Sequence, residues 1–306
     1  MNRKMIPSIE QAWTNGHISL TGQKMTVLQE AIDRLKSGES KHEKVYISYS
    51  LPAPKSIFPA SYIIDGETKT INHRVKDIEA DTSSRLTVAE VHRTFQLAFY
   101  EYKAILEHDV QGLELGLRLY SNGYERAPRT ISHYDKDMIP VGGEAHRAGD
   151  INIIFIPIPL ASRNANGFGE YRTRLGETTN SGLVIAFNSG KYFVLDDDPH
   201  IYGYPAADQK VKHNWGTSFR TTMTHELGHL FGIGHIPYPK SDDITELKGK
   251  LRSFTRIPPT IMNASTRPAV PYRYWWPNGL WEDIYLRSAL ANCYGYSLDR
   301  VVLKRV

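Results

Sequence analysis

The residues with the clearest chemical potential in this chain lie in the segment THELGHLFGIGH, residues 224–235. His225 and His229 are four positions apart. On an α-helix they therefore lie about 40° apart around the axis and one turn apart along it. Two imidazoles in this arrangement can bind a single metal ion. The spacing predicts a helix that carries a metal site on one face.

A third histidine, His235, cannot reach the same ion if the helix continues. The residues between it and His229 would rotate it by about 240° and move it roughly 9 Å along the axis. Either Gly232 or Gly234 can end the helix in the left-handed conformation at little steric cost. We therefore expect the chain to fold back at a glycine. Three imidazoles leave the fourth position of a tetrahedral zinc open to water, which is typical of a catalytic site.

Glu226 directly follows the first histidine and adds an acid to this site. Zinc lowers the pKa of a bound water to about 7, and a neighbouring carboxylate can take its proton and pass it to a departing amine. These residues predict hydrolysis of peptide bonds. The alternatives are a helix whose histidines bind no metal and a zinc site without turnover. Glu226 argues against the second, because a structural site has no use for an acid beside its open position.

The hydrophobic pattern predicts the elements that hold these residues. The site-bearing helix is expected from about Ser218, and a longer helix over Thr87–Leu106 opens on a capping box with Glu90. The core-facing stripe of the site-bearing helix consists of Phe219, Met223, Leu227 and Leu230. The other expected elements are helices at 25–35 and 282–294, strands at 45–49, 113–120, 150–158, 182–188 and 192–195, and a hairpin over 61–76. This order predicts an α+β fold.

HELGHLFGIGH matches the zinc motif HExxHxxGxxH of the metzincin metallopeptidases, and PTIMN at residues 259–263 resembles the Met-turn of that clan. Over residues 44–296 the chain is most similar to the matrixins, the matrix metalloproteinase family. The resemblance implies a zinc-dependent endopeptidase in which His225, His229 and His235 ligate one zinc, Glu226 is the catalytic residue and Met262 packs under the metal. Gly232 is expected to make the turn that ends the helix.

The same resemblance implies an α+β catalytic domain with a twisted, mostly parallel sheet, an antiparallel edge strand and three main helices. The active-site helix is expected under the cleft. Residues 1–43 would be an N-terminal appendage, either a pro-segment or a linker, and residues 44–306 the catalytic domain with inserted loops. A protein or peptide substrate is expected to pair with the edge strand. The residues that resemble this strand are Gly182, Leu183, Val184, Ile185 and Ala186.

The chain departs from the matrixins at three kinds of position. Ile185 and Val194 stand where the family has histidines for a second, structural zinc, so we expect one zinc only. Asp196 fits the family's calcium-binding aspartate, but Pro199 replaces its acidic partner, so the turn is either a Ca²⁺ site or a solvated acidic turn. The only cysteine, Cys293, lies near the C-terminus and not in a propeptide.

The amino-acid composition argues against several other classes of protein. The chain has 37 lysines and arginines against 33 acidic residues, a net charge of +4 that is too mild to indicate a nucleic-acid partner. One cysteine excludes an intramolecular disulfide framework. The longest near-apolar run, Ile151–Ala161, is too short for a membrane span, and no signal peptide is visible.

Localisation stays open at this stage, because the family resemblance suggests extracellular action whereas the missing signal suggests an intracellular protein or another route of release. Two other functions also stay open. One is a non-catalytic binding or structural protein on a metallopeptidase scaffold. The other is a peptidase with a single intracellular target, such as a toxin. The sequence does not indicate an oligomeric state.

Overall fold

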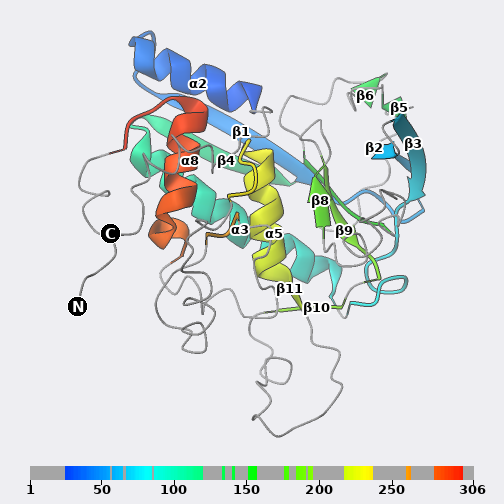
Figure 1. The fold of residues 1–306 in the computed structure, drawn as a ribbon. Coiled ribbons are helices and arrows are strands. Elements are labelled where there is room, and N and C mark those ends of the chain that lie inside the picture. Colours follow the sequence, from blue (N-terminus) through cyan, green and yellow to red (C-terminus); the bar gives the residue numbers. More distant parts are fainter. Residues whose placement is uncertain are drawn as a thin grey trace, which may run out of the picture.

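The computed structural model describes residues 25–55, 57–64, 67–84, 86–119, 133–134, 140–141, 151–156, 176–178, 184–190, 192–195, 217–236, 260–262 and 279–298. These residues form an α+β fold built on a mostly parallel sheet (Figure 1). This confirms the predicted fold class at that level. No helix among the described residues is long and apolar enough to span a membrane.

The main sheet has five strands in the order β4-β1-β7-β9-β8. Their bounds are Leu113–Leu119 for β4, Glu43–Ser50 for β1, Ile151–Ile156 for β7, Val184–Asn188 for β9 and Gly176–Thr178 for β8. The first four strands pair in parallel, whereas β8 pairs antiparallel with β9 at the end of the sheet. Parallel neighbours need a crossover connection, and between β1 and β4 the helix α3 (Val88–Asp109) provides it.

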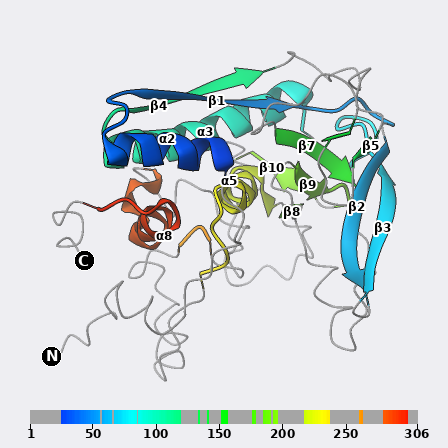
Figure 2. The same ribbon diagram turned by 90° about the horizontal axis from the view of Figure 1, so that it is seen from above.

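The helices cover one side of strands β1 and β4 (Figure 2). In the described part of the chain these helices are α2 (Thr26–Ser37), α3, α5 (Phe219–Leu230) and α8 (Ile284–Tyr294), with the short 3-10 helix η1 (Leu280–Glu282) before α8. The burial of β1 follows this arrangement. Val45, Ile47 and Tyr49 are buried, whereas Lys44 and Tyr46 point to the opposite face and are exposed. One face of the sheet therefore holds the core.

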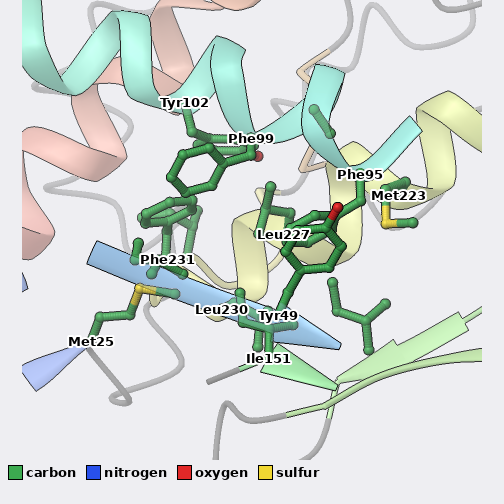
Figure 3. Close-up of a cluster of buried hydrophobic side chains, with 14 of the residues drawn as sticks. Met25, Tyr49, Phe95, Phe99, Tyr102, Ile151, Met223, Leu227, Leu230 and Phe231 are labelled. Atoms are coloured by element: carbon green, nitrogen blue, oxygen red, sulfur yellow. The ribbon is translucent and has the colours of Figure 1, made fainter. Parts of the chain in front are cut away.

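An aromatic core joins α3 to α5 and to the sheet (Figure 3). Tyr102 of α3 stacks on Phe231, which follows α5, with ring centroids 4.8 Å apart. Phe95 of α3 contacts Tyr49 of β1 at 4.3 Å. Burying a side chain of this size contributes roughly 1.5–3 kcal/mol to folding. Leu227 and its neighbours anchor one face of α5 in this core, whereas His225 and His229 on the other face are only partly buried.

Side-chain caps mark the first turns of the helices α3, α5 and α8. Thr87 and Glu90 form the predicted capping box of α3, in which Glu90 N–H donates to Thr87 Oγ1 (3.2 Å) and Thr87 N–H donates to Glu90 Oε2 (2.7 Å). Ser218 caps α5 by accepting the N–H of Thr221 (3.1 Å). Asp283 caps α8. Each cap satisfies backbone donors that the first turn of a helix leaves unpaired.

Among the residues that the structure describes, three two-stranded ladders accompany the main sheet. β2 (Ile57–Ile64) and β3 (Glu67–Arg74) pair antiparallel and overlap the hairpin that the sequence predicts over 61–76. β5 (His133–Tyr134) pairs with β6 (Pro140–Val141). β10 (Phe193–Val194) pairs in parallel with β11 (Thr217–Ser218), which leads directly into α5.

The prediction that residues 182–186 form the edge strand is wrong. In the structure β9 lies between β7 and β8, and Ile185 and Ala186 are buried inside the sheet. The antiparallel edge position belongs to β8 instead. Val184 is the first residue of β9, and Gly182 and Leu183 lie outside the described residues.

The helix α2 belongs to the same core as the sheet. Leu28, Ala31 and Ile32 are fully buried within it. Gln29 Nε2 donates to the backbone carbonyl of Tyr294 in α8 (3.4 Å). From Met25 onward, the stretch predicted as an appendage therefore packs as an integral element, while residues 1–24 lie outside the described part of the chain.

Candidate metal centre

Three imidazoles converge at the end of α5. One ring nitrogen from each of His225, His229 and His235 lies within 4.8 Å of the other two. The Nε2 atom of His225 is 3.1 Å from that of His229 and 3.2 Å from that of His235. Among the described residues, these side chains form the one group of three or more that could hold a metal ion. The structure thus brings together the three ligands that the sequence predicts.

Backbone carbonyls fix the orientation of two of the rings. The Nδ1 atom of His225 lies 2.6 Å from the carbonyl oxygen of Ile261, and that of His229 lies 2.7 Å from the carbonyl oxygen of Ile233. A carbonyl oxygen can only accept, so both Nδ1 atoms carry the proton. In a neutral imidazole the Nε2 atom is then unprotonated and offers its lone pair.

This proton arrangement fits a bound cation. Two Nε2 lone pairs 3.1 Å apart repel each other unless a positive charge lies between them. Nitrogens on a tetrahedral zinc with bonds of about 2.05 Å would be about 3.3 Å apart. Burial lowers the pKa of His225 to about 3 and that of His229 to about 4. At pH 7 both rings are therefore neutral, which is the form that binds a metal.

A glycine turn carries the third histidine back to the other two. The helix α5 ends at Leu230, and Gly232 has a φ of +86°, in the left-handed region that the sequence analysis expects there. Gly232 N–H donates to the carbonyl of His229 (2.9 Å). The N–H of Ile236, the residue directly after His235, donates to the carbonyl of Met262 (2.9 Å) and ties the turn to residues 260–262.

Met262 lies against the site-bearing helix at Gly228. The methionine is fully buried, and a Cβ on Gly228 would overlap its Sδ atom and come within 2.6 Å of the hydroxyl of Tyr102. Tyr102 also donates a hydrogen bond to the carbonyl of Thr224 (2.9 Å). The sequence analysis names Met262 but not Gly228 or Tyr102. The sequence does carry a signal for Gly228. A glycine inside a helix is about 1 kcal/mol less favourable than alanine, so its presence there indicates close packing against the helix.

Asp283 connects the segment 260–262 to α8. Its Oδ2 accepts the N–H of Ile261 (2.7 Å) and its Oδ1 accepts the N–H of Leu286 (2.9 Å). Burial raises the pKa of this carboxyl to about 6, against the opposing effect of these hydrogen bonds. Asp283 was not among the residues predicted from the sequence, because only the folded chain places it beside the Met262 segment.

The remaining residues named in the sequence analysis lie in three different places. Glu226 lies on α5 next to His225 and is 6% exposed. Ile185 and Val194 are buried in the core. Asp196 lies outside the described residues, so the structure does not bear on a calcium site there.

Comparisons with known proteins add no family to this geometry. A scan against protein-family models found no match, and neither did a search of curated proteins or a search of solved structures. The chemistry of the site is therefore argued from the three converging imidazoles and from the residues around them.

Proposed function

We propose that this protein is a zinc-dependent endopeptidase of the metzincin type, similar to the matrixins. The observation that carries the proposal is the convergence of His225, His229 and His235 at one point. The Nδ1–H groups of the first two donate to backbone carbonyls, so their Nε2 lone pairs face that point. A site of three neutral imidazoles suits zinc and leaves a coordination position for water or substrate.

Each residue of the site would then have its own role in the reaction. His225, His229 and His235 hold the zinc, which when bound supplies Lewis acidity that lowers the pKa of water and polarises a carbonyl oxygen. Glu226 is the residue after His225, so its side chain is rotated by about 100° around the helix axis. Its carboxylate would take a proton from water as the water oxygen adds to the carbonyl carbon, and would deliver that proton to the amine nitrogen as the C–N bond breaks. Met262 and Gly228 keep the floor beneath the histidines closely packed.

The sheet offers a place for an extended substrate. Within the described part of the chain, β8 is the last strand of the main sheet and pairs on one side with β9. An extended peptide can add to the other side of such an edge strand through main-chain hydrogen bonds. We propose that substrate binds along β8, Gly176–Thr178, and not along the strand predicted from the sequence.

Cleavage and metal content of purified protein test this proposal together. The zinc-loaded protein is expected to hold about one zinc per chain and to cleave an unstructured protein such as casein or a peptide library. Glu226→Gln is expected to keep the zinc and to lower the cleavage rate roughly 10²–10⁴-fold, because it removes the proton acceptor. His42→Ala, a change at an exposed histidine outside the site, is the matched control and should behave as wild type.

Two results would contradict the proposal. Protein that holds zinc but cleaves no substrate would favour a binding or structural role on a metallopeptidase scaffold. Cleavage that persists in Glu226→Gln at the wild-type rate would remove this carboxylate from the reaction. Cleavage of one protein only, with no action on denatured substrates, would keep the peptidase and narrow its target.

A further inference from the structure

A chain of hydrogen bonds leads from the first histidine of the site to a buried carboxylate. His225 Nδ1–H donates to the carbonyl of Ile261 (2.6 Å). That carbonyl shares a peptide group with the N–H of Met262, which donates to Thr260 Oγ1 (3.3 Å). The side chain of Thr260 in turn forms a hydrogen bond with the carboxylate of Asp283. These five residues come from three separate segments of the polypeptide, namely α5, residues 260–262 and the start of α8.

Every bond in this chain points the same way. A carboxylate accepts only, so the Thr260 hydroxyl donates its single proton to Asp283 and uses a lone pair for Met262 N–H. Hydrogen bonds aligned head to tail polarise one another. Thr260 is 6% exposed and Asp283 is 3% exposed, so little water competes with these bonds. The negative charge of the carboxylate therefore strengthens the Ile261 carbonyl as an acceptor.

We propose that Thr260, anchored by Asp283, is a positioning residue for the metal ligand His225 and acts through the Ile261–Met262 peptide. A stronger acceptor at Nδ1–H fixes the ring and raises the electron density at Nε2. Groups that bond directly to a metal-bound histidine typically change metal affinity by about 10–100-fold, and Thr260, which acts through one peptide group, should fall at the low end of that range. The inference deepens the proposed function and rests on it only in that the three histidines hold zinc.

Thr260 separates this role from the structural role of Asp283. Asp283 also caps α8 through Leu286 N–H and holds Ile261 N–H, so its removal would disturb the fold at two further points. The Thr260 hydroxyl caps no helix. Thr260→Val keeps the shape of the side chain and removes the hydroxyl, whereas Thr260→Ser keeps the hydroxyl and removes a methyl group. This pair is the matched test.

Two measurements on the full chain read out the effect. Competition with a chromogenic chelator gives the zinc affinity, which we expect to be about tenfold weaker in Thr260→Val and close to wild type in Thr260→Ser. NMR of the zinc-free protein gives the resonance of the His225 Nδ1 proton. A weaker hydrogen bond should move it upfield in Thr260→Val but not in Thr260→Ser. Thr260→Ala provides a second variant without the hydroxyl, should Thr260→Val fail to fold.

Either of two outcomes would overturn the inference. One is wild-type zinc affinity and an unchanged Nδ1 proton in the variants without the hydroxyl. The other is an equal loss of affinity in Thr260→Val and Thr260→Ser, which would assign the effect to packing. Neither measurement depends on cleavage. Failure of the proposed peptidase function would instead appear as zinc-loaded wild-type protein that hydrolyses nothing.

Discussion

Gly228 lies between the two helical histidines in sequence, at a point where only a hydrogen fits on the Cα atom. The Sδ atom of Met262 and the hydroxyl of Tyr102 occupy the space that a Cβ would need. Tyr102 also holds the carbonyl of Thr224, the residue before His225. The spacing between α3, α5 and Met262 is thus set at a single residue directly beneath the metal ligands.

Gly228→Ala should therefore destabilise the protein and weaken zinc binding. Overpacking of a filled core costs typically about 1–3 kcal/mol, which outweighs the gain of about 1 kcal/mol when alanine replaces glycine in a helix. Urea unfolding and chelator competition measure the two effects. Gly190→Ala is the control, because its Cβ would meet only Asn188 Oδ1 at 3.4 Å, an ordinary contact. A Gly228→Ala protein as stable as wild type would contradict the packing described here.

Acid should destabilise the zinc-free protein through its histidines. The pKa of His225 is about 3 and that of His229 about 4 in the folded protein, both lowered by burial from an unfolded value near 6.5. Between these values the unfolded chain binds more protons, so stability is full above about pH 6.5 and is lost as pH falls toward 4. Burial raises the pKa of Asp283 to about 6, so this one carboxyl stabilises the folded state as pH falls. The two histidines outweigh it.

Urea midpoints in EDTA at pH 7, 6 and 5 measure this dependence. We expect the midpoint to fall with pH, and to fall less steeply in His229→Asn because one of the two buried histidines is gone. A midpoint that rises on acidification would mean that the histidines are not desolvated as described.

At the scale of elements, a buried ion pair joins the end of α3 to α8. Arg287 Nη2 lies 2.6 Å from Asp109 Oδ1, with side chains 5% and 3% exposed, and the guanidinium also packs 4.7 Å from the ring centre of Trp281. This pair lies on the helix that Asp283 caps. It therefore helps to hold the anchor of the Thr260 hydrogen-bond chain in place.

Asp109→Asn should cost about 3–5 kcal/mol of stability, because it leaves a buried guanidinium without its counter-charge. Glu43→Gln is a matched comparison. It breaks the more exposed Arg34–Glu43 pair, whose side chains are 39% and 15% exposed, and pairs of that kind contribute about 0–1 kcal/mol. Free energies of unfolding from denaturant titrations compare the two changes. Equal losses would show that burial does not decide the worth of these pairs.

Elements with strong local signals could be predicted from the sequence, and a very short strand could not. The capping box at Thr87 and the β-branched run Ile151–Ile156 each mark an element within a few residues of where it lies. β8 has three residues and no hydrophobic pattern of its own, and its place depends on pairing with β9. Because β8 was not predicted, the edge of the sheet was assigned to residues 182–186, which overlap β9.

His225 and His229 were accessible to sequence reasoning because their spacing alone determines their geometry on a helix, and Gly232 marked the turn that brings His235 back to them. The residues that support them were not. Asp283 meets Ile261 across the fold, and Tyr102 reaches Thr224 from another helix. Such contacts depend on how elements pack and not on any local pattern. The role of α2 in the core was missed for the same reason, since its partners come from the sheet and from α8.

At the scale of the whole molecule, the proposed zinc should stabilise the fold as well as serve the proposed reaction. The ligands come from α5 and from the turn after it, and His225 is tied to residues 260–262. A metal that binds only the folded state raises the free energy of unfolding by about 2.7 kcal/mol at a concentration of 100 times its Kd. We expect thermal unfolding at a higher temperature in zinc than in EDTA. His235→Ala should abolish this difference and His42→Ala should preserve it.

The hydrogen bond from Ile236 N–H to the Met262 carbonyl bears on where the protein should tolerate insertions and deletions. The chain departs from the site at Ile236 and re-enters it beside the same residue, so whatever joins the two ends is tethered at both. Loop-closure entropy grows only with the logarithm of length, about 0.6 kcal/mol for each doubling. Insertions or deletions between Ile236 and Thr260 should therefore leave the three converging imidazoles in place.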